Sequence, residues 1–179
     1  MRRRAQLVIL CEDNQHEAFA RRMLEKLGWE TRKMRVEKCP PGSQSGAQWV
    51  RERYPVEVKA LRATSVTRAL VVMMDADAHE VAEQRRFLAD QLAKDGVAPR
   101  GDDEPIALVL PRWHVETWLA YLGGATVDEA VKYPYLERES ACAPHVDRLA
   151  AMCRDGALRA PAPASLEAAC LEIRKRLPS

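Results

Sequence analysis

The sequence predicts an α/β protein: an open, mostly parallel sheet with helices on both faces, followed by further helices at the C-terminus. Three observations support this fold class. Short apolar runs alternate with longer stretches in which apolar residues recur at helical spacing. The runs at residues 7–11, 70–74 and 106–110 are uninterrupted, as is typical of strands buried on both faces. Beyond residue 124 the pattern is helical throughout.

The first strand and helix are predicted from a run of apolar residues and two end signals. Residues 5–11 form the strand. Asn14 then has the character of a helix N-terminal cap, with Glu17 three residues later in capping-box spacing. The helix ends at Gly28, since glycine commonly follows the last helical turn.

The second strand and helix are less regular. Residues 32–37 alternate basic and apolar side chains, which favours a short, half-exposed strand. Residues 40–46 are rich in proline, glycine and serine and predict a loop. We expect the helical stretch that follows to be interrupted at Pro55, because proline cannot donate a backbone hydrogen bond. Residues 69–74 form the clearest strand.

The remaining elements complete the alternation. Asp77, with a glutamate three residues on, is expected to cap a helix that runs to about Lys94. Residues 106–110 form a further buried strand, and the helix that follows His114 ends at Gly123. Further helices are predicted at about 126–131, 144–155 and 165–177.

Composition bounds the class of protein. The 179 residues suit one domain, which we divide into an α/β core at 1–124 and a helical extension at 125–179 packed on that core. The net charge of +2 is too small to indicate nucleic-acid binding by itself. No apolar stretch is long enough to span a membrane. Five cysteines without a CxxC pair predict reduced thiols and a cytoplasmic location.

Two acidic clusters follow predicted buried strands. Glu12 and Asp13 come directly after the first strand, and Asp75 and Asp77 come after the strand at 69–74. The carboxyl ends of parallel strands meet at one edge of the sheet, where open α/β proteins bind ligands. Carboxylates gathered there repel one another unless a cation lies between them. Because oxygen ligands of this kind suit hard cations, the sequence predicts a Mg²⁺ or Mn²⁺ site.

Each acid also has a purely structural interpretation. Asp13 and Asp77 can cap the helices that follow them, through hydrogen bonds to backbone amides. Glu12 and Asp75 are harder to explain in this way, because an acid at the end of a buried strand needs a partner. We therefore favour the metal site over a structural role alone.

The segment after the last predicted strand supplies further candidates. Glu116 can add a carboxylate or orient a metal-bound water, and the alternative is an ion pair with Arg112 one turn earlier. His114 is a lone histidine, to which we assign a structural role or weak phosphate binding or proton transfer. His16 and His79 lie in the first turns of predicted helices beside the acids, where they either support the acids or are simply exposed.

These motifs resemble the TOPRIM domain, which occurs in topoisomerases, primases and OLD-like nucleases. The stretch Leu10–Phe19 resembles the first motif of OLD-like and small stand-alone members, with Glu12 at its acid position. Asp75-Ala76-Asp77 matches the Asp-x-Asp motif, and His114–Trp118 resembles the Glu-x-Trp helix of small TOPRIM-like proteins. The resemblance covers residues 5–122, and Asp13 stands where the family usually has glycine.

The resemblance implies Mg²⁺-dependent cleavage of nucleic-acid phosphodiesters. It implies that Glu12, Asp75 and Asp77 bind the metal, and that Glu12 also acts as general acid or base. Glu17 and Glu116 would be supporting acids, the former as a ligand and the latter in catalysis. Small members of this kind occur in defence islands, which implies DNA as a substrate and a separate ATPase as a partner.

Basic residues cluster in the region between the two acidic motifs and predict a surface that follows a nucleic-acid backbone. The candidates are Arg32, Lys33, Arg35, Lys38, Arg51 and Arg53, helped by the backbone amides of the loop at 42–46. The alternative for the basic residues is a solvated surface of mixed charge. The alternative for the loop is a surface connection without a binding role, which we favour.

Two other functions remain open. The start of the chain also resembles a response-regulator receiver, in which Asp75 would accept a phosphoryl group; the long gap from Asp13 to Asp75 ranks this below TOPRIM. The other is a catalytically inactive TOPRIM-like subunit, which would dock a partner or a second copy through aromatic residues. Those aromatic residues are Trp113, Trp118, Tyr133 and Tyr135, for which core packing is the alternative.

Overall fold

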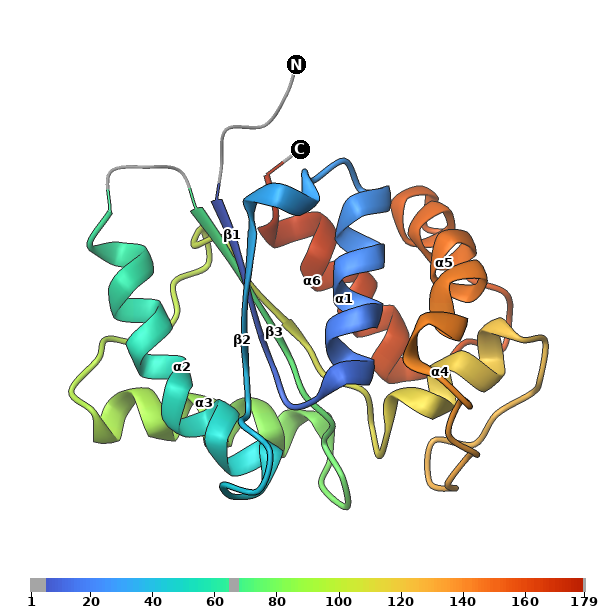
Figure 1. The fold of residues 1–179 in the computed structure, drawn as a ribbon, viewed down its shortest axis with the longest axis horizontal. Helices are drawn as coiled ribbons and strands as arrows, with labels where there is room; N and C mark the ends of the chain where they lie inside the picture. Colours follow the sequence, from blue (N-terminus) through green and yellow to red (C-terminus); the bar gives the residue numbers. More distant parts are fainter. Residues whose placement is uncertain (1–5, 65–67, 179) are drawn as a thin grey trace.

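The protein is an α/β protein, as predicted, with one open sheet of parallel strands and helices on both faces (Figure 1). The computed structural model describes residues 6–64 and 68–178. The strands are β1 (Gln6–Cys11), β2 (Met34–Lys38), β3 (Arg68–Met73) and β4 (Ile106–Val109). The α-helices are α1 (Asn14–Lys26), α2 (Gly46–Arg62), α3 (Val81–Lys94), α4 (Val115–Leu122), α5 (Ala143–Asp155) and α6 (Ala164–Arg176). Two short 3₁₀ turns are η1 (Thr31–Lys33) and η2 (Glu139–Cys142).

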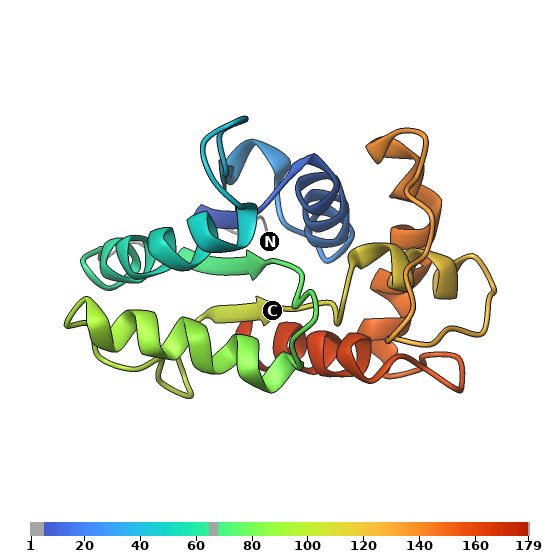
Figure 2. The same ribbon diagram turned by 90° about the horizontal axis from the view of Figure 1, so that it is seen from below.

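The strand order places a reversal in the middle of the sheet. The order is β2-β1-β3-β4, and all neighbours pair in parallel. The chain leaves β1 in one direction to form β2, then crosses back to form β3 on the other side of β1. Ligand sites of open α/β sheets lie where the direction reverses, here between the carboxyl ends of β1 and β3. Figure 2 views the molecule from the side on which these strands end.

The two faces of the sheet bury two apolar clusters. Along β1, Leu7 and Ile9 belong to one cluster while Val8 and Leu10 belong to the other, as the two-residue period of a strand requires. Helices α2 and α3 cover the second face, and α1, α5 and α6 cover the first (Figure 1). Because both faces are covered, the strands are apolar without interruption.

The predicted C-terminal helices are largely present, but one is absent. Residues 126–131 form no helix, because Asp128 uses its side chain and backbone in a local turn. The last two predicted helices correspond to α5 and α6, within one residue at each end. Their buried residues join the same apolar cluster as α1 and β1.

The prediction that all five cysteines are reduced is wrong for one pair. Cys153 on α5 and Cys170 on α6 form a disulfide, with their Cα atoms 5.0 Å apart. The packing of α5 against α6 brings these residues together, and their spacing in the sequence carries no disulfide motif. The cysteines at positions 11, 39 and 142 are free.

Three predicted helix ends or breaks need correction. The predicted cap at Asn14 is wrong, whereas the predicted capping role of Asp13 is confirmed: Oδ1 of Asp13 accepts the backbone N–H of His16 at 2.9 Å. Helix α3 begins after Glu80, which forms a reciprocal capping box with the glutamate three residues later. Helix α2 continues through Pro55, because a long buried face holds it against the sheet. No helix in the described part of the chain is both long and apolar enough to cross a membrane.

Candidate metal centre at the carboxyl edge of the sheet

Two of the predicted acids meet at the reversal of the sheet. Glu12 directly follows β1, and Asp75 lies two residues after the end of β3, the strand that pairs with β1. The Oε1 atom of Glu12 accepts the backbone N–H of Asp75 at 2.6 Å. The ends of β1 and β3 are thus joined by a side chain from one strand and the backbone of the other.

Asp75 lies at the centre of the cluster. Its side chain is 11% exposed, and each of its oxygens has a histidine partner. The Nε2 atom of His16 lies 2.9 Å from Oδ1, and the Nδ1 atom of His114 lies 3.3 Å from Oδ2. Burial by itself would raise the pKa of Asp75, but the two imidazoles outweigh burial and hold that pKa below its ordinary value. Asp75 is therefore ionised at neutral pH.

His16 is buried in the first turn of α1, between two carboxylates. Its Nδ1 atom lies 3.0 Å from Oδ1 of Asp13, at ion-pair distance but without hydrogen-bond geometry. Burial lowers the pKa of His16, yet the carboxylates of Asp75 and Asp13 raise it well above its ordinary value. The imidazolium thus holds one oxygen of Asp75 in a fixed direction.

Glu116 is the least compensated acid of the cluster. It lies in the first turn of α4 and is 5% exposed, and no other described residue donates a hydrogen bond to its carboxylate. Burial, and then the charge of Asp75, raise the pKa of Glu116. A buried carboxylate without a partner is costly unless a cation or a proton neutralises it.

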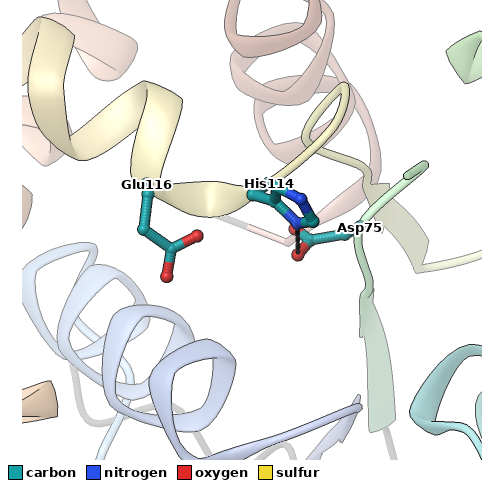
Figure 3. Close-up of side chains that lie close together, drawn as sticks. All are labelled: Asp75, His114 and Glu116. Carbon is teal, nitrogen blue, oxygen red and sulfur yellow. Dashed lines mark hydrogen bonds and ion pairs between the residues drawn. The ribbon is translucent and has the colours of Figure 1, made fainter. Parts of the chain in front are cut away.

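Three side chains converge in the geometry of a metal site. One ligand atom each from Asp75, His114 and Glu116 lie within 4.8 Å of one another. Figure 3 shows Asp75 after β3, His114 in contact with it, and Glu116 at the start of α4 without such a contact. The Nε2 atom of His114 is buried and has no hydrogen-bond partner among the described residues. Two carboxylates and one imidazole are therefore close enough together to share one cation.

Asp77 lies at the rim of this cluster. Its side chain is 52% exposed, and its Oδ1 atom lies 3.9 Å from Nδ1 of His114. Its backbone N–H donates to the carbonyl of Trp113 at 3.2 Å, and both residues have a positive φ, 51° and 60°. Non-glycine residues rarely adopt this conformation, which is found at functional sites more often than elsewhere. Burial and the charge of Asp75 raise the pKa of Asp77.

The structure does not bring Glu17 into the cluster. The carboxylate of Glu17 accepts from Nε of Arg21 at 3.0 Å and from Nζ of Lys38 at 2.7 Å. These cations hold the pKa of Glu17 below its ordinary value. Glu12 differs, because burial raises its pKa to about 7. Among the predicted metal ligands, Glu12 accepts a hydrogen bond from the backbone of Asp75, and Asp77 lies at the rim of the cluster. Glu17 lies outside the cluster and pairs with Arg21 and Lys38.

The predicted basic surface is largely neutralised by neighbouring acids. Arg32 and Lys33 both pair with Glu30. Arg35 and Arg53 share Glu37 and Glu57, Lys38 pairs with Glu17, and Arg51 donates to Gln84. The geometry therefore gives little support to a continuous cationic track for a nucleic-acid backbone. The alternative pairing of Glu116 is also wrong, since Arg112 pairs with Glu80 instead.

Two histidines join the acids at this edge of the sheet. His114 looks isolated in the sequence because its partner Asp75 is 39 residues away. Of the two expectations for His16, support of the acids holds and exposure does not, because His16 is buried against Asp75. Each stands within four residues of an acid at a strand end or helix start, and this spacing was the available signal.

Comparisons of this chain with protein families, with curated proteins and with solved structures found no match. The interpretation of the cluster therefore rests on the geometry of its own side chains.

Proposed function

We propose that the protein is a divalent-metal-dependent hydrolase of nucleic-acid phosphodiesters. The observation that carries this proposal is the buried carboxylate of Glu116, to which no other described residue donates a hydrogen bond and which lies close to Asp75 and His114 at the reversal of the sheet. Burial and the charge of Asp75 outweigh the nearby histidines and raise the pKa of Glu116, so a bound cation would stabilise its ionised form. The resemblance of the two acidic motifs to the TOPRIM domain supports the nucleic-acid substrate.

The donor set favours Mn²⁺ over Mg²⁺. Asp75 and Glu116 offer hard oxygen donors, and His114 offers an imidazole nitrogen. Mg²⁺ in proteins is held by oxygen atoms and water, whereas Mn²⁺ also accepts imidazole. Of the two cations expected from the sequence, Mn²⁺ is therefore the better match.

The residues around the ligands have separate tasks. A bound cation would supply Lewis-acid activation of a phosphodiester oxygen and of a water molecule. His16 orients Asp75 by holding its other oxygen, as second partners of metal ligands commonly do. Glu12 is placed beside Asp75, where its carboxylate can take up a proton from an attacking water.

The alternative of a receiver domain fits the geometry less well. A receiver needs an exposed aspartate oxygen that can accept a phosphoryl group. Both oxygens of Asp75 face histidines, and its side chain is almost fully buried. Of the aromatic residues proposed for a docking surface, Trp118 is buried and donates its Nε1–H to Ser165 in the core, whereas Tyr135 is exposed. An ATPase partner and a homodimer remain predictions.

A plasmid-nicking assay tests the proposal. We expect cleavage with Mn²⁺, weaker cleavage with Mg²⁺ and none with EDTA. Asp75→Ala should lower the rate at least about a hundredfold, because several kcal/mol of transition-state stabilisation are removed. Glu116→Gln should abolish Mn²⁺ binding measured by calorimetry while the fold is kept.

Asp155→Ala is the matched control, since Asp155 is an exposed aspartate at the end of α5. It should leave both cleavage and Mn²⁺ binding unchanged. Cleavage that survives Asp75→Ala, or Mn²⁺ binding that survives Glu116→Gln, would contradict the assignment of the metal ligands.

A further inference from the structure

A hollow with a volume of about 340 Å³ opens beside Glu12. It lies between the ends of β1 and β2 and the loop that precedes α2. Glu12 lines this hollow, and the same side chain accepts the backbone N–H of Asp75. The hollow is therefore adjacent to the proposed metal centre. Its volume lies in the range of sites that take small molecules or parts of larger ones.

The charges around the hollow disfavour an anionic group such as a phosphate. Glu12 and Asp13 supply two carboxyl groups to its lining. Lys38 is the sole cation among the described residues of the lining, and its Nζ already contacts Glu17 at 2.7 Å and the side chain of Asn14. A phosphate would meet the carboxylates with no uncommitted cation beside it. A neutral group avoids this repulsion.

Two amide side chains in the lining keep one hydrogen-bonding group each. The Oδ1 atom of Asn14 accepts from Lys38, an ammonium that can only donate, so the free group of Asn14 is its NH₂. The NH₂ of Gln44 donates to the carboxylate of Glu52 at 3.1 Å, so the free group of Gln44 is its carbonyl oxygen. Among the described contacts, Asn14 thus keeps a donor and Gln44 an acceptor, beside the carboxyl groups of Glu12 and Asp13 in the same lining.

We propose that this hollow takes one unpaired nucleobase next to the phosphodiester that is cleaved. The edge of a nucleobase presents donors and acceptors side by side, and proteins that read unpaired bases bind this edge. A base that uses this edge in the hollow cannot at the same time pair with a second strand. The preferred substrate is then single-stranded or locally unpaired nucleic acid. This inference rests on the proposed function for the position of the scissile bond.

The test uses three substrates of one sequence: a single strand, a full duplex, and a duplex with a one-nucleotide bulge. With Mn²⁺, the single strand and the bulged duplex should be cleaved at least about tenfold faster than the full duplex, because extruding a paired base costs a few kcal/mol. Gln44→Ala should lower kcat/KM on the single strand about three- to tenfold, as expected for one lost hydrogen bond.

Gln48→Ala is the matched control. Gln48 also donates to Glu52, at 3.0 Å, but it does not line the hollow. Its substitution should change no rate. Equal cleavage of the single strand and the duplex by the unmodified protein would overturn the inference and leave metal-dependent hydrolysis intact. The same loss in the Gln44 and Gln48 variants would also overturn it.

A binding measurement separates this inference from the proposed function. If no substrate is cleaved, the proposed hydrolase activity is wrong. The base site can then still be tested by measuring the binding of the single strand and the duplex by fluorescence anisotropy, in EDTA at fixed ionic strength. Tighter binding of the single strand than of the duplex, with the preference lost in Gln44→Ala and kept in Gln48→Ala, would support the base site. Equal binding of both substrates would overturn it.

Discussion

At the residue scale, Gly46 allows the first turn of α2 to lie against the side chain of Glu12. A Cβ atom at this position would lie 2.8 Å from Cβ of Glu12 and 3.0 Å from its Oε2. The Cβ of Glu12 is fixed by the backbone and cannot swing away, so any larger residue would push α2 or the end of β1. The position of Glu12 beside Asp75 thus depends on a glycine in another element.

Gly46→Ala should therefore destabilise the protein, although alanine is the better helix former by about 0.5–1 kcal/mol. We expect the free energy of unfolding to fall by about 1–3 kcal/mol, as for other overpacked positions. Mn²⁺-dependent cleavage should fall as well. Urea denaturation measures the first effect and plasmid nicking the second.

Gly101→Ala is the control for this change. A Cβ at Gly101 would meet Glu104 no closer than 3.5 Å, an ordinary contact. A Gly46→Ala variant that is as stable and as active as Gly101→Ala would contradict the close-contact argument.

At the element scale, Glu172 ties α6 to the edge strand of the sheet. Its carboxylate accepts the backbone N–H of Leu108 on β4 at 3.1 Å, Nη1 of Arg100 at 2.6 Å and Nη1 of Arg85 at 3.0 Å. Burial opposes ionisation, but the donors outweigh it and lower the pKa of Glu172 to about 2. One side chain thereby joins the C-terminal helix, the edge strand and α3.

Glu172→Gln should destabilise the protein by about 2–3 kcal/mol at neutral pH. The folded-state pKa is depressed, so the stabilisation is fully present above the ordinary value of 4.5 and is lost as the pH falls through about 2. The difference in unfolding free energy between wild type and variant should shrink over that window, as measured by urea denaturation at several pH values.

Glu167→Gln, on the exposed face of the same helix, is the control and should change the free energy of unfolding little at neutral pH. A stability difference for Glu172→Gln that stays constant from neutral pH to pH 2 would exclude the ionised carboxylate as its source.

At the scale of the whole molecule, the C-terminal helices complete the core on one face of the sheet. Val146 and Leu149 on α5, and Leu166 and Ile173 on α6, are buried in the cluster that also holds Phe19 of α1. Removing α5 and α6 would expose this apolar face to water. Exposed patches of this kind lead to aggregation or loss of the native state.

A chain that ends at residue 124 should therefore not fold on its own. We expect the helical signal in circular dichroism to fall by more than the absence of α5 and α6 accounts for. We also expect no cooperative thermal transition, and aggregation during size-exclusion chromatography. The full chain is the control and should unfold in one transition. A monomeric, cooperatively unfolding fragment would show instead that residues 1–124 are an independent domain.

Local sequence predicted the strands well and the helix starts less well. Strands at 69–74 and 106–110 were each found within one residue, because an uninterrupted apolar run leaves few alternatives. Asp77 and Glu80 both have an acid three residues later, so spacing alone could not choose between them as a cap. In the structure, Asp77 lies in a turn at the site, where its backbone contacts Trp113, and Glu80 is the cap of α3.

The fold class, and the position of Glu12 and Asp75 at one edge of the sheet, could be predicted from the amino-acid sequence. Both follow from patterns within a few residues, the apolar runs and the acids that end them. Three other features emerge from the folded chain alone: β1 and β3 are neighbours, His114 and Glu116 join Asp75, and Glu17 pairs with Lys38. Strand order, ion pairing and the disulfide depend on which distant segments pack together, and such contacts leave no trace in local spacing.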